Sequence, residues 1–90
     1  MTIEFFSNAF SCAHRIIPGE IEKEHFLLLI DISTIRSDKI INALNDYFVL
    51  GETRAAVCQK YNVNQGYLSL KIRELQALSA KIYNLFPFYA

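Results

Sequence analysis

This 90-residue chain has few cysteines, few glycines, no long apolar run and no net charge. Cys12 and Cys58 are too few and too far apart for a disulfide framework, and they are typical of reduced thiols in a cytoplasmic protein. The three glycines are scattered, so no phosphate-binding loop is present. The run Phe26–Ile30 is too short to span a bilayer. The acidic Glu4 and the lack of a basic cluster near the N-terminus argue against a signal peptide.

The composition indicates one small domain. Hydrophobic residues make up 52% of the chain and charged residues 20%, which is too apolar for disorder and sufficient for one modest core. A core of this size leaves little room for a deep catalytic cleft. The charges are unevenly spread: acidic residues outnumber basic ones up to Leu50, and basic residues outnumber acidic ones from Gly51 onward. A nucleic-acid-binding surface would therefore lie in the second half of the chain.

Hydrophobic spacing predicts an all-α domain of about four to five helices over residues 20–86, after an arm over 1–19 and before a tail over 87–90. A helix over residues 20 to about 33 would begin with an acidic first turn. Ser37 is the expected N-cap of a second helix, which Gly51 would end in a left-handed conformation. Thr53 is the expected cap of a short third helix, and the last helix would stop before Pro87.

Residues 53–72 have the order of a helix-turn-helix: a short helix, a turn of about three residues and a second helix. Such a unit needs a small residue at the helix crossing, a turn residue that tolerates positive φ, an apolar plug and buried anchors one turn apart. The residues that meet these demands in turn are Cys58, Asn62, Val63, and Leu68 with Ile72.

The polar residues left over on this unit suit DNA. The first residues of a recognition helix meet base edges, where Asn or Gln pairs with adenine, while Ser, Tyr, Lys and Arg hold phosphates. Gly66 would let the backbone approach a phosphate closely. The predicted DNA-binding residues are Arg54, Lys60, Asn64, Gln65, Gly66, Tyr67, Ser69, Lys71 and Arg73. The alternative is a plain helical hairpin with a solvated polar face.

The same segment resembles the PapB-type fimbrial (adhesin) regulators of enteric bacteria. The residues that carry the resemblance are Arg54, Val57-Cys58, Lys60-Tyr61, Val63-Asn64, Gly66, Leu68-Ser69, Ile72 and Leu75, with further likeness upstream as far as Pro18. The resemblance implies a transcription regulator in the cytoplasm, at the nucleoid, that binds AT-rich DNA upstream of fimbrial operons and oligomerises along it. It also implies that substituting Arg54 or Cys58 disrupts DNA binding or self-association. Tyr67, Leu70 and Lys71 are bulkier or more basic than expected of relatives, which bears on sequence preference.

Self-association would also offset the absence of net charge, because copies side by side add their phosphate contacts along one duplex. The predicted contacts between copies are Phe26, Leu29, Cys58, Tyr83 and Phe86. Core packing is the alternative for the apolar residues between Phe26 and Ile32.

Other kinds of site are not expected. Cys12, His14, His25 and Cys58 match no zinc-ligand spacing, and Cys58 as a nucleophile would need an orienting histidine nearby. We therefore expect no metal, cofactor, small-molecule ligand or membrane contact, and no enzymatic activity. The remaining alternative is a helical protein-interaction module that modulates another regulator without binding DNA.

Overall fold

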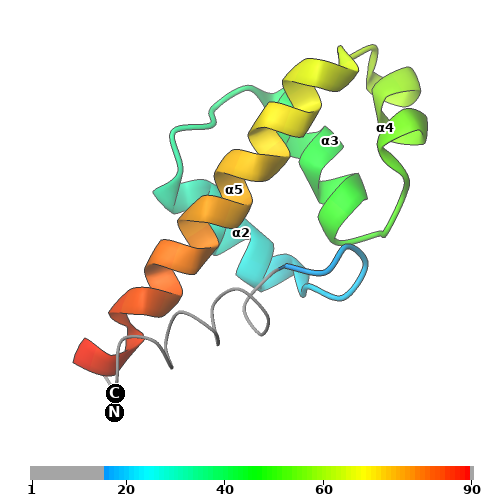
Figure 1. The fold of residues 1–90 in the computed structure, drawn as a ribbon. Helices are drawn as coiled ribbons and strands as arrows, with labels where there is room; N and C mark the ends of the chain where they lie inside the picture. The colour runs from blue at the N-terminus through cyan, green and yellow to red at the C-terminus, as the bar shows by residue number, and fades with distance from the viewer. Residues whose placement is uncertain (1–15, 90) are drawn as a thin grey trace.

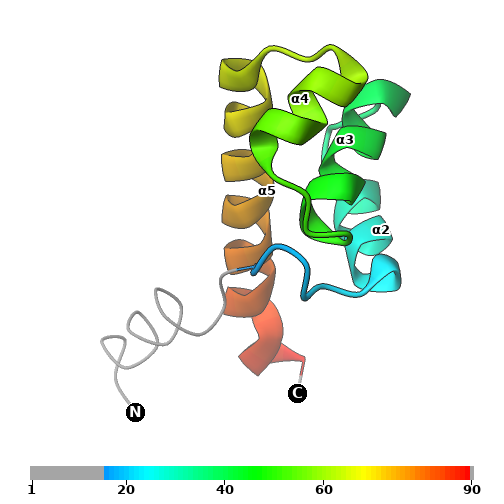
Figure 2. The same cartoon turned by 90° about the vertical axis from the view of Figure 1, so that its right-hand side faces the viewer.

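The computed structural model describes residues 16–89, which form four α-helices and a short 3-10 helix, without strands in that range. The elements are α2 (Lys23–Ile32), α3 (Asp38–Phe48), α4 (Arg54–Tyr61), α5 (Gln65–Leu85) and η1 (Phe86–Phe88). Helix α5 runs the length of the molecule, with α2 and α3 packed on one side of it and α4 beside its first turns (Figures 1 and 2). The predicted all-α class is confirmed. No helix between residues 16 and 89 is long and apolar enough to cross a membrane.

One core joins all four of these helices. Phe26, Leu44, Phe48 and Leu68 are completely buried at its centre, and burying an apolar side chain of this size stabilises the fold by about 1.5–3 kcal/mol. The buried side chains of α5 all come from its first half. Leu78 and Ile82 of the second half are partly buried against the same core, and the last turns extend past the other helices (Figure 2). The core residues are Ile16, Ile21, Phe26, Leu29, Ile30, Ile35, Ile40, Ala43, Leu44, Phe48, Val57, Cys58, Leu68, Ile72 and Leu75.

Helices α3 and α4 each begin on a side-chain cap, as does α5, whose cap is described with the candidate interface. The amide of Ile40 donates to Ser37 Oγ at 3.4 Å, and that of Ala56 donates to Thr53 Oγ1 at 3.1 Å. Both predicted caps are confirmed. Each satisfies one of the amide groups that the first turn of a helix leaves without a partner.

The start of α2 differs from the prediction, since the helix begins at Lys23 and not at residue 20. The residue before it, Glu22, has an extended backbone and makes no side-chain cap. Pro18 and Gly19 form a turn instead, which the amide of Glu20 closes by donating to the carbonyl of Ile17 at 3.0 Å. The turn carries Ile21 into the core, and this burial outweighs the favourable interaction of acidic side chains with a helix N-terminus.

The segment Ile16–Gly19 is fastened to the helical body. The side-chain amide of Gln76 accepts from the Ile16 amide and donates to the Ile16 carbonyl, both at 2.8 Å. The amide of Gly19 donates to the carbonyl of Phe48 at 2.8 Å. The last four residues of the predicted 1–19 arm therefore pack on the domain, while residues 1–15 lie outside the described part.

Gly19 and Gly51 meet where this segment passes the end of α3. Their φ angles are +85° and +79°, and a Cβ on either would lie only 3.3 or 3.2 Å from the Cα of the other. The predicted left-handed conformation of Gly51 is confirmed, but the helix ends earlier, at Phe48, with Val49 as its C-cap. Gly51 therefore allows both the left-handed backbone conformation and the close approach of Gly19.

Candidate nucleic-acid interface

The helix-turn-helix forms as predicted, from α4, a three-residue turn and the first half of α5. Asn62 has φ 56° and ψ 52°, in the left-handed region, and the amide of Val63 donates to the carbonyl of Cys58 at 2.9 Å. Val57 and Leu68 are fully buried between the two helices, and the half-buried Val63 packs against the same core. The turn lies at one extremity of the molecule, so the beginning of α5 is open to a partner (Figures 1 and 2).

The N-terminus of α5 presents polar and aromatic side chains to solvent. The Asn64 carboxamide oxygen accepts from the amide of Tyr67 at 3.0 Å, so Asn64 is the N-cap of α5 and its NH₂ group remains as a donor. A Cβ at Gly66 would lie 3.1 Å from that oxygen, so this glycine leaves room for the cap. Gln65 and Tyr67 are exposed beside it.

Arg54 and Ser69 are brought together from the two helices of the unit. The Arg54 Nη1 group donates to Ser69 Oγ at 3.2 Å, on the exposed surface. This contact joins the first residue of α4 to the second turn of α5. The guanidinium has four further N–H donors to offer a phosphate or a base edge.

Both of the predicted DNA-binding lysines form ion pairs within the protein. Lys71 Nζ lies 3.2 Å from Glu74 Oε1 and 5.3 Å from the centre of the Tyr67 ring, and its side chain is only 19% exposed. Lys60 Nζ lies 2.8 Å from Asp46 Oδ2 and 3.9 Å from Glu52 Oε2. Both cations have a carboxylate partner before any phosphate approaches.

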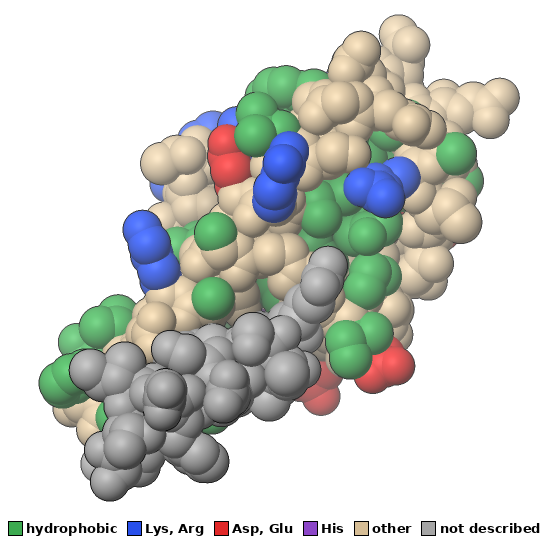
Figure 3. All heavy atoms as spheres, viewed as in Figure 1, with side chains coloured by type: hydrophobic (Ala, Val, Ile, Leu, Met, Phe, Trp, Pro, Cys, Tyr) green, Lys and Arg blue, Asp and Glu red, His purple; other side chains and the backbone are tan. Residues whose placement is uncertain are grey.

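Arg73 differs from these lysines, because its exposed side chain has no ion-pair or hydrogen-bond partner among residues 16–89. Basic side chains on the face shown in Figure 3 stand apart, separated by mostly uncharged surface and, in the upper part, by an acidic side chain. The candidate interface is thus a set of separate cations around polar side chains, and the attraction that it could offer a phosphate is modest.

Asp46 is the feature of this region that the sequence did not reveal. It is 4% exposed, and its carboxylate accepts from Lys60 Nζ and Tyr61 Oη, both at 2.8 Å. Burial acts to raise the pKa of this carboxyl, but the hydrogen bonds from Lys60, Tyr61 and Asn45 outweigh it and hold the pKa below its usual value of 3.8. The sequence signal that could have predicted its burial is its position three residues after Ala43, which places both on the same, buried side of α3.

Comparison with known proteins shows the family of this chain. A family model described as "adhesin biosynthesis transcription regulatory protein" matches residues 3–89. The chain belongs to this family. Escherichia coli regulatory protein FanB is 56% identical over 73 residues, which cover 81% of this chain and 74% of FanB. The E. coli major pilus subunit operon regulatory protein PapB is 45% identical over 74 residues, covering 82% of this chain and 71% of PapB.

A solved structure also resembles this member of the adhesin regulator family. The crystal structure of E. coli FocB superposes with a TM-score of 0.80 at 37% identity, covering 97% of this chain and 98% of that one. The relatives are regulatory proteins by name, and the resemblance found in the sequence is confirmed at the level of the family.

The residues predicted to contact a second copy fall into two groups. Phe26, Leu29 and Cys58 are buried in the core of one chain, so their packing there accounts for their apolar character. Tyr83 is half-buried and Phe86 is 59% exposed, and their rings stack with centroids 6.1 Å apart. Only the second group lies where a neighbouring copy can touch it.

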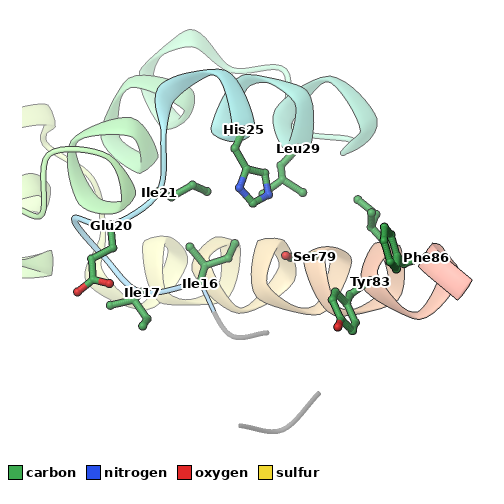
Figure 4. A pocket seen from close by; sticks show the side chains of 10 residues that line it. Ile16, Ile17, Glu20, Ile21, His25, Leu29, Ser79, Tyr83 and Phe86 are labelled. Carbon is green, nitrogen blue, oxygen red and sulfur yellow. The ribbon is translucent and has the colours of Figure 1, made fainter. Parts of the chain in front are cut away.

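A cavity of about 400 Å³ lies away from the helix-turn-helix, between α2, the second half of α5 and the segment that leads into α2. Its walls are mainly apolar, with His25 and Ser79 facing each other across it (Figure 4). Among residues 16–89, no group of three His, Cys, Asp or Glu side chains is placed to hold a metal ion. Cys12 and His14 of the zinc alternative lie outside that range.

Proposed function

We propose that this chain is a transcription regulator of fimbrial operons that binds AT-rich double-stranded DNA through α4 and α5, as a homo-oligomer at the nucleoid. The observation that carries the proposal is the exposed start of α5, where Gln65 and Tyr67 project beside the bridged pair Arg54 and Ser69. The names of the relatives support the operon-regulating part, since PapB is named for a pilus subunit operon and two further relatives for adhesin operons.

Each exposed side chain has a role in this proposal. Gln65 pairs with an adenine edge, and the free NH₂ of Asn64 donates to an acceptor on a neighbouring base. Arg54 and Ser69 together hold one phosphate, and Arg73 holds a second one further along α5. Tyr67 makes an apolar contact with sugar or thymine methyl groups. Lys60 and Lys71 contribute little, because each is paired with a carboxylate.

The small number of free cations makes oligomerisation part of the mechanism. Each neutralised phosphate contributes about 0.9 to the slope of log K against log salt, so two phosphates per copy give a slope of about 2. Several copies on one duplex sum their contacts and reach a useful affinity. The exposed Phe86, Phe88 and Tyr89 at the end of the chain are apolar surface available for such assembly.

A titration of AT-rich and GC-rich duplexes of increasing length, at two salt concentrations, tests the proposal. We expect stepwise binding that favours AT-rich DNA, strengthens with duplex length and weakens with salt. Equal affinity for both compositions would contradict the AT-rich part, and length-independent affinity would contradict the oligomer.

The alternative function, a protein-interaction module, draws on the zero net charge and on the pairing of Lys60 and Lys71 with internal carboxylates. It predicts that no duplex binds at low salt, whatever its composition or length. The same titration therefore distinguishes the two functions.

A further inference from the structure

We propose that Asp46 is a positioning residue for DNA recognition, which holds both ends of α4 on α3 and so fixes the angle at which α5 meets a duplex. This inference rests on the proposed function. Asp46 itself is buried and makes no contact with DNA in the proposal; it acts through the residues of α4 that it holds.

The end of α4 is held by the Asp46 side chain. Its Oδ2 atom accepts from Lys60 Nζ and from Tyr61 Oη, both at 2.8 Å. Tyr61 is the last residue of α4 and directly precedes Asn62, whose left-handed conformation turns the chain into α5. One buried oxygen therefore fixes the residue from which the recognition helix departs.

The entry to α4 is held by the Asp46 main chain. The amide of Glu52 donates to the Asp46 carbonyl at 3.0 Å, and the next residue, Thr53, caps α4. A single residue of α3 thus contacts the segments immediately before and at the end of α4. Hydrogen bonds to a buried charged group are among the stronger ones in proteins, which suits them to fixing a geometry.

Helix α4 needs this support because few of its side chains are buried. Of its eight residues only Val57 and Cys58 are buried, Tyr61 is half-buried against the core, and the Arg54 to Ser69 bridge is exposed. Two adjacent core residues allow a short helix to pivot, whereas polar contacts at both of its ends do not. The orientation of α4 consequently depends on its contacts with Asp46, whereas the orientation of a deeply packed helix depends mainly on the core.

The test compares DNA affinity in variants that keep the net charge constant. The double substitution D46N/K60M removes one negative and one positive charge, so the long-range field on DNA is unchanged. We expect its Kd for the AT-rich duplex to rise about tenfold, with the salt slope of the parent. Y61F removes one hydrogen bond to the same carboxylate, keeps the ring in place, and is expected to raise Kd about threefold. It keeps the proposal falsifiable if the double variant does not fold.

Two controls separate positioning from general stability and from direct contact. Gln76→Ala removes two hydrogen bonds on the far half of α5, and at conditions where all variants are fully folded it should bind with the parent Kd. K60M alone should keep the parent salt slope; a slope lower by about 0.9 would show that Lys60 itself contacts a phosphate and would overturn the proposal.

The outcomes for the inference and for the proposed function are distinct. If the parent binds and folded D46N/K60M and Y61F bind equally well, the positioning role of Asp46 is wrong while the DNA-binding function stands. An equal loss of affinity in Gln76→Ala would assign the effect to stability and also overturn it. If the parent binds no duplex at low salt, the proposed function fails and this inference fails with it.

Discussion

Helices α3 and α4 begin in the same way but are held in place differently. Both start on a hydroxyl cap, Ser37 and Thr53. Helix α3 buries five of its eleven residues, whereas α4 buries two of eight. Apolar packing therefore fixes α3, and polar contacts to α3 and α5 fix α4. A helix at the proposed DNA interface must keep its surface exposed, so hydrogen bonds supply the positioning that core packing would otherwise provide.

The largest contrast is expected when a core side chain is removed from each helix. Phe48→Ala should lower the free energy of unfolding by about 3–5 kcal/mol, because it leaves a large cavity at the centre of the core. Val57→Ala removes fewer buried atoms and should lower it by about 2 kcal/mol. Urea unfolding of both variants measures the difference. A greater loss for Val57→Ala would contradict the assignment of α4 as the weakly packed helix.

Acid should weaken the contacts that Asp46 makes between α3 and α4. The pKa of Asp46 is lowered in the folded chain, so its contribution to stability is complete above its unfolded value of 3.8 and disappears as the pH falls through its folded value. The difference in free energy of unfolding between the parent and D46N/K60M should thus be larger at pH 7 than at pH 3. Urea unfolding at the two pH values measures it. A difference independent of pH would show that the pKa of Asp46 is the same in the folded and unfolded chains, and would contradict the lowered pKa.

Removing the cap of α3 or of α4 should lower the stability of the protein by a similar amount, but the two substitutions should differ in their effect on DNA affinity. Thr53→Ala and Ser37→Ala should each lower the free energy of unfolding by about 1 kcal/mol. Only Thr53→Ala should also weaken DNA binding, because α4 alone carries Arg54 to the proposed interface. Equal binding by the two variants in an anisotropy titration would remove this distinction.

An effect on stability of the same small size is expected at the turn between α4 and α5. Asn62→Ala should lower the free energy of unfolding by about 1 kcal/mol, because alanine is strained in the left-handed region that Asn62 occupies. Asn62→Gly relieves that strain and should stay close to the parent. Thermal unfolding of the pair measures the difference, and identical midpoints would contradict the role of this residue.

The sequence predicts those features that depend on neighbouring residues. Residues within a few positions of one another determine four such features: the cap Ser37, the cap Thr53, the turn at Asn62 and the end of α5 before Pro87. The helix-turn-helix was predictable for that reason, and its resemblance to the adhesin regulators allowed the family to be identified.

Contacts between distant residues could not be predicted in this way. The Gln76 amide meets the Ile16 backbone across 60 positions, and Lys60 meets Asp46 across 14. Whether a lysine such as Lys60 faces DNA or a buried carboxylate depends on how α3 and α4 pack, which no local pattern encodes. The start of α2 was mispredicted for a related reason, since the turn before it is set by the burial of Ile21.

The most direct test of DNA binding through the helix-turn-helix is an anisotropy titration of a labelled AT-rich duplex with the parent, R54A and Lys23→Ala. Both variants lose one exposed cation, but Lys23 begins α2 at the opposite end of the domain from the turn before α5. We expect R54A to raise Kd at least tenfold, as loss of a charge-assisted contact implies, and Lys23→Ala to bind like the parent. Equal affinities for all three proteins would contradict the account.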